Sequence, residues 1–242
     1  MLHSAGKLMN VKSVKRMRVF LIESPSAIDI LNGESEAETL RPICRLLGHE
    51  FASTIVRSNQ EFETAVKHIT SIDENHVPKN RRGMPLCLHL AAHGNKGGLA
   101  MGAEDASWEL LASHLRRFSK EMTHYSGPLV LVLSSCGSES QKITSLFTDY
   151  AKRNTNFRPP VYVITTVSDE EGEVYWRDAV VAWSIFYHQT GDAVLSDKDE
   201  MKTIIDKIAL TGAGALKYFR WDEEKKKYMC YVSELNEYVH GA

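Results

Sequence analysis

The chain has 242 residues, of which 25% are charged, and its formal net charge is −2. This length suits one α/β domain with an ample core, and the near-neutral charge gives no sign of a nucleic-acid-binding or anionic-membrane surface. The apolar runs fall short of the ~20 residues that span a bilayer, and the basic segment 1–17 lacks the continuous apolar region of a signal peptide. We therefore expect a cytoplasmic protein with a flexible leader over 1–17 and a single domain over 18–242, divided into a core over 18–193 and an addition over 194–242.

Short apolar runs alternate along the chain with stretches that carry apolar residues at helical spacing. The runs predict strands over 18–22, 51–56, 86–90, 129–133 and 161–165. The helical spacing predicts helices over 35–47, 59–72, 108–118, 140–152 and 179–187. Loops are expected over 23–33 and 73–83, a hairpin over 94–102, and a terminal helix over 201–208 with strands over 216–221 and 228–232. Pro42 should delay or kink the first helix, because proline removes a hydrogen-bond donor.

This alternation predicts an α/β fold, with a doubly wound, mostly parallel sheet flanked by helices and a small C-terminal helix and β-hairpin addition. The four cysteines lie far apart, without a CxxC pair or the Cys/His spacing of a zinc site, so no disulfide framework, metal site or cofactor is predicted. Cys44 and Cys87 fall within expected apolar elements, where cysteine acts as a small buried hydrophobe. Cys136 differs because it follows a strand.

Two chemically useful residues lie where expected strands end. His93-Gly94 follows the apolar run 86–92, and Cys136-Gly137 follows the run 128–133. Open parallel sheets place ligand and catalytic groups at such ends, and neighbouring strands lie ~5 Å apart. A histidine within reach can activate a thiol, and the backbone N–H groups of Gly94 and Cys136 can hold the oxyanion of acyl transfer. The sequence thus predicts a Cys/His dyad.

Periodicity alone also allows an inert strand-end histidine and a small buried cysteine in a non-enzymatic domain. Such a catalytically silent α/β module would use its cleft to bind a peptide or a partner protein. A third reading keeps the dyad but assigns it to small amides or thioesters. His89 is interpreted as a hydrogen-bonded core residue rather than a second base.

The stretches 88–94 and 129–136 resemble the strand-His-Gly and strand-Cys signatures of the caspase-like cysteine peptidase clan, and the chain is most similar to the bacterial CHAT-type branch. Further similarity runs through 98–102, 108–111, 163–166, 175–178 and 186–191, and the resemblance covers about 18–193. It implies a caspase-hemoglobinase fold, with Cys136 as nucleophile, His93 as general base and acid, and the Gly94 and Cys136 amides as oxyanion donors. It also implies an endopeptidase acting on a protein or peptide substrate, a regulated effector in bacterial defence or programmed death that a partner protein activates.

The substrate specificity is left open by departures from the clan. The caspase sequence Gln-Ala-Cys-Arg-Gly is replaced by residues 134–138, Ser-Ser-Cys-Gly-Ser, so the glutamine that helps to read an aspartate is absent. Related members read a basic side chain with an acidic residue two positions before the cysteine, where this chain has Ser134. The acidic run Asp169, Glu170, Glu171 and Glu173 can attract Lys or Arg, or form a solvated loop. Arg177 can pair with an acidic substrate or a surface carboxylate, and Trp176 can wall the pocket or belong to the core. The candidate substrate-binding residues are therefore Ser134, Asp169, Trp176 and Arg177.

Overall fold

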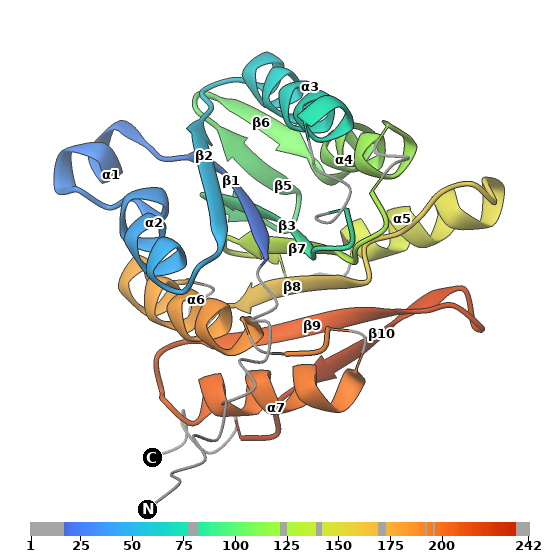
Figure 1. The fold of residues 1–242 in the computed structure, drawn as a ribbon. Coiled ribbons are helices and arrows are strands. Elements are labelled where there is room, and N and C mark those ends of the chain that lie inside the picture. The colour runs from blue at the N-terminus through green and yellow to red at the C-terminus, as the bar shows by residue number, and fades with distance from the viewer. Residues whose placement is uncertain are drawn as a thin grey trace, which may run out of the picture.

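One sheet of seven strands organises the described residues, in the order β10-β9-β8-β7-β3-β1-β2 (Figure 1). The computed structural model describes residues 17–76, 82–121, 125–138, 142–168, 173–191, 193–195 and 197–235. The parallel strands are β1 (Arg18–Ser24), β2 (Glu50–Ile55), β3 (Leu86–Ala92), β7 (Leu129–Ser134) and β8 (Tyr162–Val167). The antiparallel strands β9 (Ala215–Asp222) and β10 (Lys227–Val232) continue the sheet beyond β8.

Helices cover both faces of the sheet, because its central strands are apolar on both sides. On one face, α3 (Asn59–His76), α4 (Trp108–Glu121) and α5 (Lys142–Arg153) pack on a core that includes Phe20, Leu88 and Phe147. On the other face, α2 (Glu36–Leu46), α6 (Trp176–Thr190) and α7 (Lys198–Ala209) pack on a core that includes Leu21 and Trp183. The doubly wound, mostly parallel sheet predicted from the sequence is confirmed.

Two local predictions are corrected in the N-terminal half. The segment predicted as a loop over 23–33 contains the end of β1 and a short helix, α1 (Ala27–Asn32), which Ser26 caps and Gly33 ends at a φ of 72°. The delay predicted from Pro42 does not occur, since α2 begins at Glu36 and runs to Leu46 with Pro42 inside it. Pro42 is exposed to solvent, so water can solvate the carbonyl that lacks a donor.

The expected hairpin after β3 is part of a small antiparallel sheet. It consists of β4 (Gly94–Asn95), β5 (Gly98–Met101) and β6 (Glu104–Ser107). The C-terminal helix and hairpin form as expected, and their strands extend the main sheet. Met17, placed in the leader by the sequence, is buried in the core, while residues 1–16 lie outside the described part. None of the helices in the described ranges is both long and apolar enough to cross a membrane.

The carboxyl ends of β1, β3 and β7 are level with one another. Glu23 pairs with Ala91, and Ala91 pairs with Ser134, so the three residues form one row across the sheet. Glu23 accepts a hydrogen bond from the start of α2, and Ser134 accepts one from Trp183 of α6. The row therefore faces the helical layer of α2 and α6, at the edge where β3 and β7 end.

Candidate active site

His93 and Cys136 meet at one small cavity. They are level in the register of the sheet, since Ala91 of β3 pairs with Ser134 of β7 and each site residue lies two positions beyond its member of this pair. Both side chains line a cavity of about 280 Å³ between the strand ends, α1 and the start of α6. The His93 side chain is 63% exposed and Cys136 is half-buried, so both are accessible from solvent. The structure thus brings together the two residues singled out at strand ends.

Two glycines allow the loops of His93 and Cys136 to approach closely. A Cβ atom on Gly94 would lie 2.8 Å from the Cys136 carbonyl oxygen. Gly137 has a φ of 70°, and a Cβ atom there would lie 2.5 Å from the Asn95 carbonyl carbon. Side chains rarely tolerate either condition, so glycine is needed at both positions. The loop after β7 therefore packs directly against the hairpin that follows His93.

The hairpin directs the Gly94 N–H away from its neighbouring strand. The Ala100 N–H donates to the His93 carbonyl at 2.8 Å, which makes His93 and Ala100 a hydrogen-bonded pair. Pairs alternate along an antiparallel ladder, so the next pair, Gly94 and Leu99, is of the non-hydrogen-bonded kind. The Gly94 N–H is consequently available to an acceptor outside the hairpin.

Asp29, which is not among the residues predicted from the sequence, holds the His93 ring. Asp29 Oδ2 lies 2.8 Å from His93 Nε2 and accepts a second hydrogen bond from the Ser26 N–H at 2.6 Å. Partial burial acts to raise the pKa of Asp29, but the hydrogen bonds from Ser26 and His93 outweigh it and leave that pKa below its ordinary value. An ionised partner at Nε2 fixes the proton there and leaves Nδ1 as the free base. The signal in the sequence was the Ser26-x-x-Asp29 spacing of a capping box.

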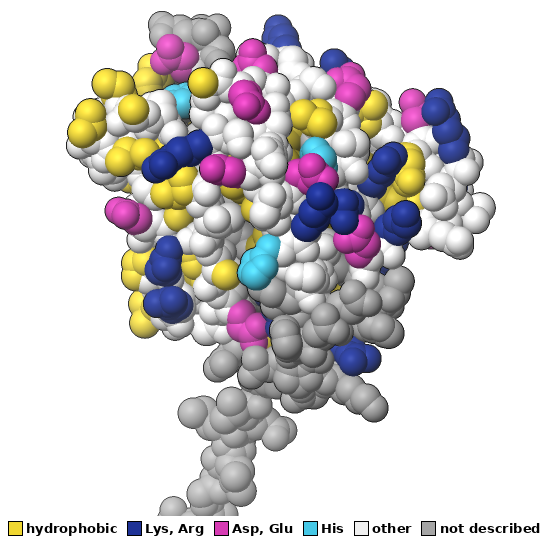
Figure 2. All heavy atoms as spheres, turned by 90° about the horizontal axis from the view of Figure 1, so that it is seen from above, with side chains coloured by type: hydrophobic (Ala, Val, Ile, Leu, Met, Phe, Trp, Pro, Cys, Tyr) yellow, Lys and Arg dark blue, Asp and Glu magenta, His cyan; other side chains and the backbone are white. Residues whose placement is uncertain are grey.

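The helix that carries Asp29 is apolar and exposed. Ile28, Ile30 and Leu31 of α1 are 64%, 49% and 82% exposed, and no residue of this helix is buried. Figure 2 looks down on the molecule of Figure 1 and shows hydrophobic side chains gathered on the left, the side on which α1 lies. Asp29 is therefore held mainly by its cap and by His93 rather than by packing of its helix.

A buried polar network lies beneath the cavity. Trp183 Nε1 donates to Ser134 Oγ at 2.8 Å, and Ser134 Oγ donates to Glu36 Oε1 at 2.5 Å. Glu36 Oε2 lies 2.9 Å from His89 Nε2, but the two atoms lack the alignment of a hydrogen bond. His89 Nδ1 lies 2.8 Å from the Tyr187 hydroxyl. His89 is thus a fully buried core residue, as its position within the strand suggested.

The four candidate substrate-binding residues have different positions. Ser134 and Trp176 line the cavity with His93 and Cys136. The Arg177 side chain is 79% exposed, lies 3.6 Å from Asp178 and covers the Tyr175 ring, and it is not among the cavity-lining residues. Asp169 lies outside the described residues, as do Glu170 and Glu171 of the same acidic run.

The other cysteines have environments that disfavour the thiolate. Burial raises the pKa of Cys44 and of Cys87 to about 12, and both are fully buried, as predicted. Cys230 lies on β10, where partial burial raises its pKa. A thiolate is the reactive form of cysteine, so these three are poor nucleophiles at neutral pH. In the described part of the chain, no three His, Cys, Asp or Glu side chains form a group that could hold a metal ion.

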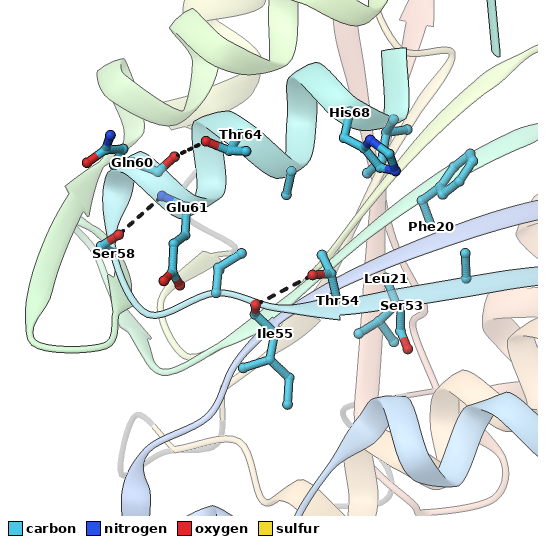
Figure 3. A pocket seen from close by; sticks show the side chains of 14 residues that line it. Phe20, Leu21, Ser53, Thr54, Ile55, Ser58, Gln60, Glu61, Thr64 and His68 are labelled. Carbon is cyan, nitrogen blue, oxygen red and sulfur yellow. Dashed lines mark hydrogen bonds between the residues drawn. The ribbon is translucent and has the colours of Figure 1, made fainter. Parts of the chain in front are cut away.

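A larger cavity of about 740 Å³ lies at the free edge of the sheet. Figure 3 shows Ser53, Thr54 and Ile55 of β2 on one side of it and Gln60, Thr64 and His68 of α3 on the other. The described lining of this larger cavity contains no cysteine. It contains serine and threonine hydroxyls, but no histidine there pairs with a carboxylate as His93 pairs with Asp29. Its size alone gives it no chemistry comparable to that of the smaller cavity.

No family model and no curated protein matches the chain. Among solved structures, caspase-1 from Spodoptera frugiperda aligns with a TM-score of 0.49 and 12% identity, over 81% of this chain and 78% of that one. A structure of pro-sf-caspase-1 aligns with a TM-score of 0.48 and 13% identity, over 81% and 82%. Neither names a CHAT-type protein, so that resemblance stays a prediction, and the function proposed below rests on residues of this chain.

Proposed function

We propose that the protein is a cysteine endopeptidase that cleaves peptide bonds through a thioester on Cys136. One observation carries this proposal: His93 and Cys136 line the same accessible cavity, and Asp29 holds His93 through Nε2. The base atom that remains is Nδ1, on a ring fixed at the end of β3. A thiol, an oriented base and a third group that orients the base form the usual constellation of nucleophilic catalysis.

The proposed chemistry begins with transfer of the Cys136 proton to His93 Nδ1. The thiolate then attacks the scissile carbonyl carbon, forming a C–S bond while the carbonyl electron pair moves to oxygen. The N–H groups of Gly94 and Cys136 stabilise this oxyanion, and each donor of this kind contributes about 10²–10³ in rate. Collapse breaks the C–N bond, and His93 gives its proton to the leaving amine.

The second half of the reaction releases the acid product. Water attacks the thioester carbonyl and gives a proton to His93, which now acts as a general base. Collapse breaks the C–S bond, the acid leaves, and the proton returns to Cys136. Asp29 remains ionised throughout and stabilises the imidazolium that forms twice in each cycle. It acts as a positioning residue because it contacts His93 rather than the substrate.

The first experiment measures thiol reactivity at neutral pH. Four proteins are treated with iodoacetamide: the unaltered chain, Cys136→Ala, His93→Ala and, as the matched control, Cys230→Ala. Intact-mass spectrometry follows the extent of labelling, and peptide mapping identifies the labelled cysteine. Rapid labelling confined to Cys136, slowed by loss of His93 and unchanged in Cys230→Ala, is the expected result. The same four proteins are then incubated with a mixed peptide library, where cleavage should require Cys136 and His93 only.

Two results would contradict the proposal. Slow labelling spread over several cysteines, without peptide cleavage, would favour a silent module that binds a peptide or partner in the cleft. Rapid labelling of Cys136 with hydrolysis of small thioesters or amides, but never of peptides, would instead assign the dyad to a small-molecule hydrolase.

A further inference from the structure

The cavity beside Cys136 and His93 is lined by carboxylates. Glu23, Asp29, Glu34 and Glu36 all line it, and its described lining includes no lysine or arginine. Three of these carboxylates have assigned partners. Asp29 binds Ser26 and His93, and Glu23 accepts hydrogen bonds from the Ser35 hydroxyl and the Glu36 N–H at 2.7 Å each. Glu36 shares one oxygen with Ser134, which leaves its second oxygen to be accounted for.

That second oxygen is buried and receives no hydrogen bond. Glu36 is 5% exposed, and Oε2 has no aligned donor among the described residues, although His89 Nε2 lies 2.9 Å away. Two further polar groups of the lining are in the same condition: the Ser135 hydroxyl, on a residue that is 4% exposed, and the Trp176 indole N–H. Buried polar groups are ordinarily satisfied, so these three indicate that a polar ligand binds in the cavity. A group that donates can complete the Glu36 and Ser135 oxygens, whereas the Trp176 N–H only donates and needs an acceptor such as a substrate carbonyl oxygen.

The Glu36 carboxylate is also held in place before any ligand arrives. Ser134 donates to Oε1 and is itself fixed by Trp183, so the carboxylate needs little reordering to accept a ligand. Glu36 belongs to α2, whereas Ser134 lies at the end of β7, the strand that precedes Cys136. Ser134 itself cannot carry a charge, but its hydroxyl lies 2.5 Å from the carboxyl group that α2 supplies.

We infer that this cavity binds the basic side chain of the substrate residue whose carbonyl Cys136 attacks, and that Glu36 reads its positive charge. This inference rests on the proposed function, because it assigns a side chain to the same site. The cavity of about 280 Å³ suits one side chain, since pockets for whole ligands usually start near 300 Å³. Trp176 lines it with an aromatic ring, which favours a guanidinium or ammonium group, whereas the Tyr175 ring is already covered by Arg177.

An acidic substrate side chain fits the same surroundings poorly. It would place another carboxylate among Glu23, Asp29, Glu34 and Glu36, and like charges in a partly desolvated site repel. Arg177, which could have attracted an acidic group, points its charge to Asp178 and solvent. The charge of the described lining therefore selects a cation and rejects an anion.

The test compares fluorogenic peptides that differ only at the cleaved position, with arginine, lysine, citrulline, leucine or aspartate there. Citrulline matches arginine in shape but carries no charge. We expect kcat/KM for arginine or lysine to exceed that for citrulline by about 10- to 100-fold, since a charged hydrogen bond contributes about 1.5–3 kcal/mol. Aspartate should be the poorest substrate.

Variants then identify the residue that reads the charge. Glu36→Gln should reduce the arginine-to-citrulline ratio at least tenfold, while iodoacetamide still labels Cys136 at the unaltered rate. Glu38→Gln is the matched control, because Glu38 lies on the same first turn of α2, is exposed and does not line the cavity. If Glu36→Gln fails to fold, the citrulline comparison in the unaltered protein still decides the charge requirement.

The outcomes separate the two proposals. Efficient cleavage after citrulline, leucine or aspartate overturns the basic side chain and leaves the endopeptidase intact. A basic preference that survives in Glu36→Gln overturns the role of Glu36. Cleavage of none of the peptides, together with slow iodoacetamide labelling, overturns the endopeptidase itself and the inference with it.

Discussion

His89 and His93 lie four residues apart on the same chain segment, and each meets a carboxylate through Nε2, at 2.9 Å from Glu36 and 2.8 Å from Asp29. His89 is fully buried within β3, with the Tyr187 hydroxyl at its other nitrogen. The His93 side chain is 63% exposed beyond the end of that strand. A histidine beside a carboxylate therefore belongs to the core within β3, whereas beyond the end of β3 it keeps one ring nitrogen free to act as a base. The position of each histidine relative to the end of β3 explains this difference in burial.

Replacing each histidine by alanine should separate the catalytic role of His93 from the structural role of His89. Of all the substitutions, these two should have the largest effects on activity and on stability. His93→Ala should lower kcat/KM by at least about 10²–10⁴-fold, the contribution of a positioned general base, and change the free energy of unfolding by less than about 0.5 kcal/mol. His89→Ala should lower the free energy of unfolding by about 2–5 kcal/mol, because it leaves a cavity beside Trp183 and removes the histidine partner of the buried Tyr187 hydroxyl. Urea unfolding and peptide hydrolysis measure both quantities.

The comparison fails if the two variants behave alike. Loss of activity in His89→Ala at a temperature where that variant is fully folded would show that the buried pair takes part in the chemistry. Strong destabilisation by His93→Ala would show that the exposed pair is structural.

Asp29→Asn should have the next largest effect and act through His93. An asparagine can present its NH₂ group to Nε2, which would favour the wrong tautomer, so kcat should fall by about 10- to 10⁴-fold with little change in KM. Asp149→Asn serves as the matched control, because Asp149 is an exposed aspartate that forms only a surface pair with Lys152. An unchanged kcat in Asp29→Asn would mean that His93 needs no partner at Nε2.

The sequence predicted the two strand ends because local signals determine them. The runs 86–92 and 129–133 are mainly apolar, as in central parallel strands, and the register that levels His93 with Cys136 follows from their pairing. The thiol and the base were therefore found from position alone. Their roles stay predictions until activity is measured.

The sequence did not predict the carboxylates around these residues, because long-range contacts place them. Asp29 reaches His93 across 64 positions, and Glu36 reaches Ser134 across 98. A loop is predicted over 23–33 because Ser24-Pro25-Ser26 is a turn signal, and the six residues of α1 are too few to show a helical period. Glu36 lies in the first turn of α2, where an acidic residue already has a local explanation in the helix dipole.

The smallest expected effect concerns acid stability, and it sharpens the difference between the exposed and the buried pair. The folded-state pKa of Asp29 lies below its ordinary value of 3.8, so Asp29 stabilises the fold fully above pH 3.8 and loses this contribution as the pH falls through the lowered pKa. The unaltered protein should therefore exceed Asp29→Asn in free energy of unfolding by up to about 1 kcal/mol at pH 6, the usual value of a capping contact. The difference should shrink once the pH falls below 3.8 and disappear below the folded-state pKa. Urea titrations of both proteins across this range measure it. A difference that persists unchanged at pH 3 would mean that the Asp29 carboxylate stabilises the protein by something other than its charge.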